Sequence, residues 1–139
     1  MPNSPTRPVQ VPSGRQSIQE MIQQARKGIT YRHFKGIVKQ SPFDLKQWAD
    51  FLHLSERTMQ RYQKENKTFQ QPYSERILEI DLLVQKGIEV FEDKDNFRSW
   101  LSLKNRALGD LTPNEFMDSS FGLELISDEL DRIEHGVFS

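Results

Sequence analysis

The 139-residue sequence predicts an all-α fold, and three observations support that prediction. Apolar residues recur at spacings of three and four over most of the chain, as they do along one face of an amphipathic helix. Two capping-box patterns, Ser17/Glu20 and Thr112/Glu115, indicate helix N-termini. No segment alternates apolar and polar residues convincingly and no internal repeat is present, so neither a sheet nor a repeat architecture is expected.

The composition narrows the functional classes. The chain contains no cysteine, which excludes disulfides and thiolate metal sites. It has no apolar run long enough for a transmembrane helix, and residues 1–14 lack the apolar stretch of a signal peptide, so we expect a cytoplasmic protein. The three histidines are too scattered to pair as metal ligands, and there is no Gly-rich phosphate loop. An enzyme, a metal site or a cofactor therefore finds little support.

Charge is divided unevenly along the chain. Residues 1–90 hold 14 Lys/Arg and 9 Asp/Glu, a net charge of +5, whereas residues 91–139 hold 5 and 11, a net charge of −6. Opposite charges on the two parts indicate two different partners. The alternative is that both parts simply expose solvated charges.

The N-terminal segment divides into an arm and two helices. Four prolines with polar spacers in residues 1–15 predict a disordered arm. Ser17 then serves as the expected N-cap of a helix over 18–27 that stops at Gly28. A second helix is expected from Thr30 to just before Pro42.

The segment from Phe43 to Asn66 has the pattern of a helix-turn-helix. Leu45, Trp48, Ala49 and Leu52 recur at helical spacing, and Ser55 is a good N-cap for a second helix that docks through Met59 and Tyr62. His53 stands where such turns commonly carry glycine. The docking leaves outward the side chains that we expect to bind DNA: Arg57, Thr58, Gln60, Arg61 and Lys64.

The charge around this motif agrees with DNA binding. Residues 26–67 hold 10 Lys/Arg against 4 Asp/Glu. The alternative for the same pattern is an ordinary helical hairpin with a basic solvent face.

The second part of the chain continues the helical pattern. A broad apolar stripe over 77–91 predicts a helix that is buried on more than one side, either as the centre of a domain or as a dimer seam. A short helix with Phe97, Trp100 and Leu101 on one face should follow, then a loop over 105–109 and an element that begins at Thr112 and closes at Gly122. The last helix is expected over 123–135, with Gly136 as a left-handed C-cap.

Three stretches together resemble the Xre/MbcA/ParS-type antitoxins of RES-Xre toxin–antitoxin systems. They are the helix-turn-helix segment 44–66, the middle segment from Phe97 through Gly109 to Thr112-Pro113, and Leu130-Asp-Arg-Ile-Glu-His-Gly-Val-Phe-Ser139. The resemblance covers roughly Gly28 to Ser139. It implies an Xre-like helix-turn-helix DNA-binding domain, placed at 16–73, and a helical dimerisation and toxin-binding domain, placed at 74–139.

The resemblance also implies the function. Such antitoxins bind a NAD-consuming RES-domain toxin, cover its active site with their C-terminal end, and repress their own promoter as dimers or larger assemblies without enzymatic activity or a cofactor. The residues expected to contact the toxin are Arg132, Glu134, His135, Val137, Phe138 and Ser139. A negatively charged end could replace substrate phosphates through charge-assisted hydrogen bonds. The alternative function is a stand-alone helix-turn-helix repressor with a C-terminal dimerisation domain.

Overall fold

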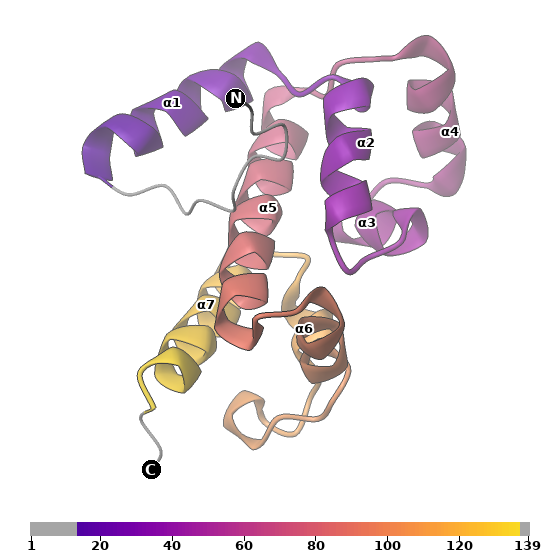
Figure 1. Ribbon diagram of the computed structural model, residues 1–139. Coiled ribbons are helices and arrows are strands. Elements are labelled where there is room, and N and C mark those ends of the chain that lie inside the picture. The colour runs from indigo at the N-terminus through magenta and orange to yellow at the C-terminus, as the bar shows by residue number, and fades with distance from the viewer. Residues whose placement is uncertain (1–13, 137–139) are drawn as a thin grey trace, which may run out of the picture.

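The computed structural model describes residues 14–136, with side chains from Ser17 onward, and this part of the chain is all-helical (Figure 1). Between residues 14 and 136 no strand forms, and only two isolated bridges occur, Thr30 to Thr68 and Asn105 to Leu111. The all-α prediction is confirmed. The elements are α1 Gly14–Lys27, α2 Tyr31–Gln40, α3 Leu45–Phe51, α4 Glu56–Glu65, α5 Gln71–Phe91, α6 Lys94–Leu101, the 3-10 turns η1 Arg106–Leu108 and η2 Pro113–Phe116, and α7 Ser120–Glu134.

Side-chain caps fix most of the helix starts. Thr30 and Ser55 each accept a hydrogen bond from the amide three residues on, and the Ser55 cap of α4 was predicted from the sequence. Asp44 and Gln47 form a complete capping box at α3. The prediction for Ser17 was wrong, because α1 already begins at Gly14 and places Ser17 inside the helix. The predicted arm falls mostly on residues 1–13, which lie outside the described residues.

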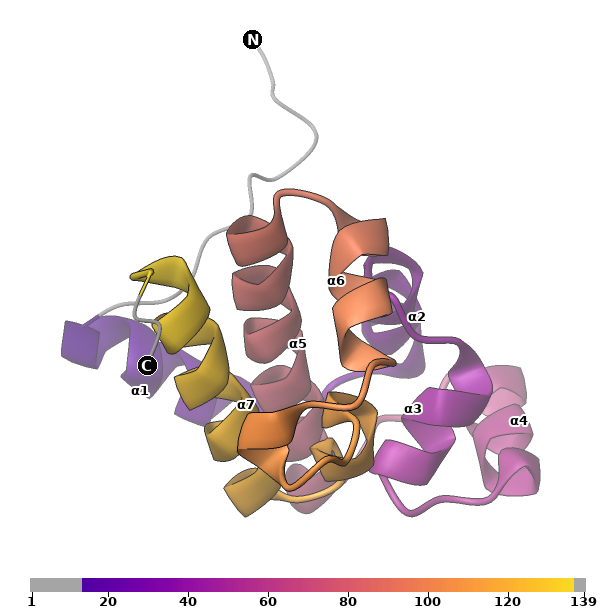
Figure 2. The same ribbon diagram turned by 90° about the horizontal axis from the view of Figure 1, so that it is seen from below.

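Helix α5 is the central element of the fold. It has 21 residues, and α1, α6 and α7 all pack against it (Figures 1 and 2). Its buried side chains surround most of the helix girth, which explains the broad apolar stripe in the sequence: Ile77, Leu78, Ile80, Leu83 and Val84. The stripe thus belongs to the core of a single chain. The boundary proposed at residue 73 falls in the first turn of α5, and the core continues across it.

Aromatic rings fill the core around the helix-turn-helix. The ring of Phe34 packs edge-on against the rings of Trp48 and Phe69, with ring centroids separated by 5.4 Å and 5.1 Å. The buried indole N–H of Trp48 donates to the hydroxyl of Ser41 (2.9 Å). Ser74, fully buried at the start of α5, accepts from the amide of Ile29 and donates to the carbonyl of Phe69, both at 2.9 Å. These hydrogen bonds attach the first turn of α5 to the segment before α2 and to the segment after α4.

The last helix starts earlier than the sequence suggested. Gly122 was expected to close the preceding element, but it lies in the first turn of α7, whose N-cap is Ser119. A Cβ at Gly122 would lie 2.0 Å from the carbonyl oxygen of Phe116, so glycine is required here by close packing and not by a chain break. Gly136 has φ of +65° and follows the helix as predicted.

Candidate functional sites

The first candidate site is the helix-turn-helix formed by α3 and α4. Four residues, 52–55, connect the two helices, and the amide of Leu54 donates to the carbonyl of Ala49 (2.9 Å) to close the turn. Met59 and Tyr62 are buried and dock α4 against the core. The predicted motif is therefore present, with the predicted residues at the helix contact.

The outward face of α4 carries most of the residues expected to bind DNA. Arg57, Gln60, Arg61 and Lys64 are exposed and lie at successive spacings of three, one and three, which places them on one side of the helix. Thr58 differs from them because it is half-buried and its hydroxyl accepts from Ser55 (2.9 Å) as part of the helix cap. The structure thus groups four of the five residues and assigns the fifth to the cap.

His53 in the turn explains how this chain manages without the usual glycine. It adopts φ of +59°, the left-handed region that glycine normally supplies. Its Nε2 lies 3.1 Å from the carbonyl oxygen of Asp118, which also accepts from the guanidinium of Arg76 (2.6 Å). The turn of the helix-turn-helix thereby touches the loop that precedes α7.

The second candidate site is the C-terminal end of α7. Arg132, Glu134 and His135 are exposed there. Arg132 pairs with Glu129 (2.9 Å), and the Nδ1–H of His135 donates to the carbonyl of Asp131 (2.8 Å). The other three residues expected to contact the toxin, Val137, Phe138 and Ser139, lie outside the described residues.

Lys86 attaches this end of α7 to the central helix. Its ammonium group pairs with Asp131 and donates to the hydroxyl of Ser127 (3.0 Å). Asp131 therefore serves the packing of α7 on α5. By contrast, Glu134 at the same end has an exposed side chain that faces solvent.

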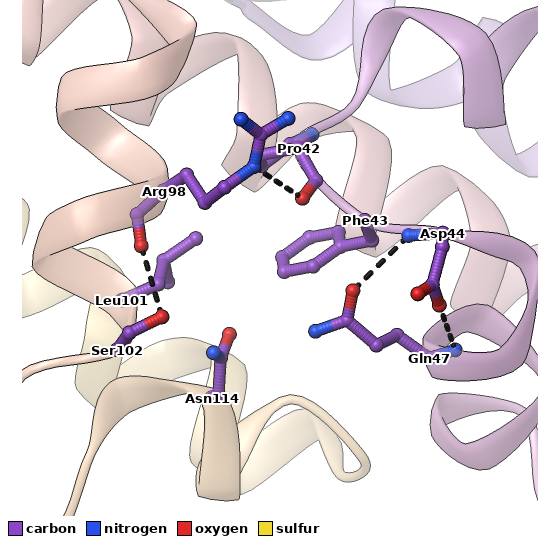
Figure 3. Close-up of a pocket in the computed structure, with 8 residues that line it drawn as sticks. All are labelled: Pro42, Phe43, Asp44, Gln47, Arg98, Leu101, Ser102 and Asn114. Carbon is purple, nitrogen blue, oxygen red and sulfur yellow. Dashed lines mark hydrogen bonds between the residues drawn. The ribbon is translucent and has the colours of Figure 1, made fainter.

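A polar crevice of about 390 Å³ separates the α2–α3 connection from α6 and η2 (Figure 3). Arg98 bridges its upper rim, donating to the carbonyl of Pro42 (3.2 Å) while pairing with Asp95 (2.7 Å). The Oδ1 atom of Asn114 is buried at this crevice without a hydrogen-bond partner. These contacts join the two parts of the chain side by side. Among the residues described, no group of three or more His, Asp or Glu is arranged to hold a metal ion.

Comparison with known proteins assigns both parts of the chain. A model of the antitoxin Xre-like helix-turn-helix domain matches residues 20–80, and a model of the antitoxin Xre/MbcA/ParS C-terminal toxin-binding domain matches residues 86–136. The chain belongs to the Xre/MbcA/ParS antitoxin family. The family is one of antitoxins and not of enzymes, which agrees with the expectation from the sequence.

Two curated relatives carry the name antitoxin Xre. The one from Yersinia enterocolitica is 29% identical over 84 residues, which is 60% of this chain and 57% of the relative. The one from Photorhabdus laumondii is 31% identical over 67 residues, which is 48% of this chain and 45% of the relative. The chain thus spans about half the length of the curated relatives it matches.

One surface of the domain matched at residues 86–136 was not predicted from the sequence. Phe121 is 87% exposed and Leu125 is 49% exposed, one turn apart on the outer side of α7. The spacing of four between them was visible in the sequence, but the expected helix start at residue 123 left Phe121 outside the helix. No described helix of the chain is both long and apolar enough to cross a membrane.

Proposed function

We propose that this chain is a type II antitoxin that binds and inhibits a NAD-consuming RES-domain toxin and also binds its own promoter as a repressor. The observation that carries the proposal is the match of a toxin-binding domain to residues 86–136, directly after an Xre-like helix-turn-helix domain. Family membership and the absence of cysteine both agree with a cytoplasmic location. The chain acts as a homodimer within a larger complex with the toxin.

Inhibition is achieved by the last turn of α7 and the residues that follow it. A pocket that consumes NAD has to bind phosphate groups and therefore carries cationic side chains. The exposed carboxylate of Glu134 can form charge-assisted hydrogen bonds with such cations, and Phe138 supplies an aromatic ring for the space that a ring of the substrate would fill. Arg132 and His135 contact the rim of the pocket, and Val137 and Ser139 complete the inserted segment.

Repression rests on the outer face of α4. Arg57, Gln60 and Arg61 suit base edges, whereas Lys64 suits a phosphate. One helix-turn-helix reads one half-site, so a homodimer provides the second half-site and the affinity that a modest basic face lacks by itself.

The decisive experiment compares the full chain with a variant that lacks residues 137–139. Each is co-expressed with a candidate RES-domain toxin, and cell NAD and growth are measured. Protection by the full chain alone supports inhibition through the inserted segment. Protection by both keeps the antitoxin function and rejects the inserted segment. Protection by neither rejects the antitoxin function and favours the alternative of a stand-alone repressor.

Two point variants separate insertion from helix capping. Phe138→Ala should abolish neutralisation, whereas Val137→Ala should reduce it less and should also lower the stability of α7, because residues just after a left-handed cap often contact the last helical turn. Circular dichroism of the purified variants distinguishes the two effects.

The repressor function is tested by titrating promoter DNA at several salt concentrations. Arg61→Ala should weaken specific binding by about 1–3 kcal/mol, and Lys64→Ala should reduce the slope of log affinity against log salt by about 1. Arg106→Ala, an exposed arginine in η1, is the matched control and should leave both quantities unchanged. An equal loss with Arg106→Ala would reject α4 as the DNA-binding face.

A further inference from the structure

The outer side of α7 carries a continuous row of exposed residues. Phe121, Leu125, Asp128, Arg132 and His135 follow one another at spacings of four, three, four and three, which is the pattern of one helix face. The opposite side of α7 holds the buried residues that pack on α5: Gly122, Leu123, Ile126 and Leu130. The row is therefore directed away from the core over the whole length of the helix.

The apolar part of this row is not explained by the fold of the chain. Phe121 is the most exposed of the large apolar side chains in the described part, at 87%. An aromatic and an aliphatic residue one turn apart on an exposed helix face are typical of a binding surface, because aromatic side chains often supply much of the energy of an interface.

A groove between α7 and α5 is lined in part by Ser120 and Glu124, the sequence neighbours of Phe121 and Leu125. Helices α5 and α7 enclose a depression of about 430 Å³, with Leu82 and Leu83 on one wall and Leu123 on the other. Lys86, Glu79 and Glu124 lie around it. A partner that covers Phe121 would therefore also have an adjacent, partly apolar depression to fill.

Helix α7 lies on the side of the central helix that faces away from the helix-turn-helix. In both views α7 lies on one side of α5 and the helix-turn-helix helices α3 and α4 lie on the other (Figures 1 and 2). The row does not suit DNA, because acidic residues lie within it (Asp128) and beside it (Glu124, Glu129 and Asp131).

We propose that the outer face of α7 is a docking surface for the toxin, with Phe121 and Leu125 as its apolar anchors. The inference rests on the proposed antitoxin function and adds a second contact to the segment after Gly136. The matched toxin-binding domain covers all of α7, and the row ends at His135, next to the residues proposed to enter the active site. From Phe121 to His135 the row extends about 21 Å, which fits within an interface of standard size.

The test measures the affinity of the purified full chain for a RES-domain toxin by calorimetry. Phe121→Ala should weaken binding at least about tenfold, and Phe121→Ala with Leu125→Ala should weaken it further. Leu103→Ala, which removes a leucine that is 63% exposed in the same domain but not on α7, is the matched control and should change affinity less than about twofold. Phe121→Glu places an acid in the first turn, where the helix tolerates it, and should weaken binding without unfolding the protein.

The outcomes separate this inference from the proposed function. Tight toxin binding by the full chain together with unchanged binding by the Phe121 variants would overturn the docking surface and keep the antitoxin function. A full chain that does not bind the toxin would overturn both. If light scattering showed that Phe121→Ala dissociates an antitoxin dimer while the affinity for toxin persists, the face would belong to a second copy and the inference would be wrong.

Discussion

Helices α4 and α7 are both amphipathic, with a buried inner face and an exposed outer face, but the side chains on their outer faces differ in chemistry. The outer face of α4 consists of polar and basic residues, whereas that of α7 begins with two apolar residues and continues with charged ones. A basic face of the kind expected to bind DNA can therefore be recognised from the sequence pattern and its charge. A surface for a protein is recognised only when the structure shows which apolar side chains remain outside the core.

The two matched domains, residues 20–80 (the helix-turn-helix part) and residues 86–136 (the toxin-binding part), nevertheless share one core. The largest predicted effect tests whether the two parts unfold together. Phe97 is fully buried in α6, and its ring lies against Gly87 of the central helix. Phe97→Ala should lower the free energy of unfolding by about 3–5 kcal/mol, because it removes a large buried ring and leaves a cavity. The measurement is urea unfolding in a Trp100→Phe background, in which Trp48 reports on the helix-turn-helix part alone.

If the continuous core makes one cooperative unit, Phe97→Ala should lower the urea midpoint measured by Trp48 fluorescence as much as the midpoint measured by circular dichroism. A Trp48 midpoint that stays in place while circular dichroism shows an earlier transition would mean that the two parts unfold separately. The Trp100→Phe protein without the Phe97 change is the control for both signals.

The sequence predicted the helix-turn-helix part better than the toxin-binding part for a physical reason. The α4 site depends on local features, namely the Ser55 cap, the docking pair Met59 and Tyr62, and exposed charges three to seven residues apart. The contact of His53 with Asp118 joins residues 65 positions apart and cannot be predicted from a local pattern.

The start of α7 was predicted wrongly for a related reason. Glycine commonly ends a helix, and so Gly122 was interpreted as an end. In the structure the carbonyl of Phe116 occupies the space of a Cβ, a packing constraint that does not appear in the local sequence. Once α7 begins at Ser120, its first turn includes Phe121 and directs that ring outward.

The same substitution at two glycines should have opposite effects in the two parts. Gly122→Ala should lower the free energy of unfolding by about 1–3 kcal/mol, because the new methyl group meets backbone that cannot give way like a flexible side chain. Gly36→Ala in α2 should raise it by about 0.5–1 kcal/mol, because that site has open space and alanine favours the helix. Thermal unfolding of both variants checks the pair, and a stabilised Gly122→Ala protein would contradict the packing described at α7.

The smallest predicted effect is a pH dependence that belongs to the helix-turn-helix part. Burial raises the pKa of the Tyr31 hydroxyl above its ordinary value of 10.0. Below that pH the residue is neutral in both states and stability is unaffected. As the pH rises above 10.0, the Tyr31 hydroxyl loses its proton first in the unfolded chain. The folded protein therefore loses stability, by at most about 1.4 kcal/mol for each pH unit, until Tyr31 also ionises in the folded state.

Tyr31→Phe keeps the ring that packs against Phe34 and Phe69 but removes this titration. The loss of stability between pH 9 and pH 11 should therefore be smaller in the variant than in the unmodified chain, and the lysines that titrate in the same range cancel in the comparison. Urea unfolding at the two pH values measures the difference. Equal losses in both proteins would mean that Tyr31 ionises as readily in the fold as in the unfolded chain, and that the alkaline sensitivity of the protein resides elsewhere.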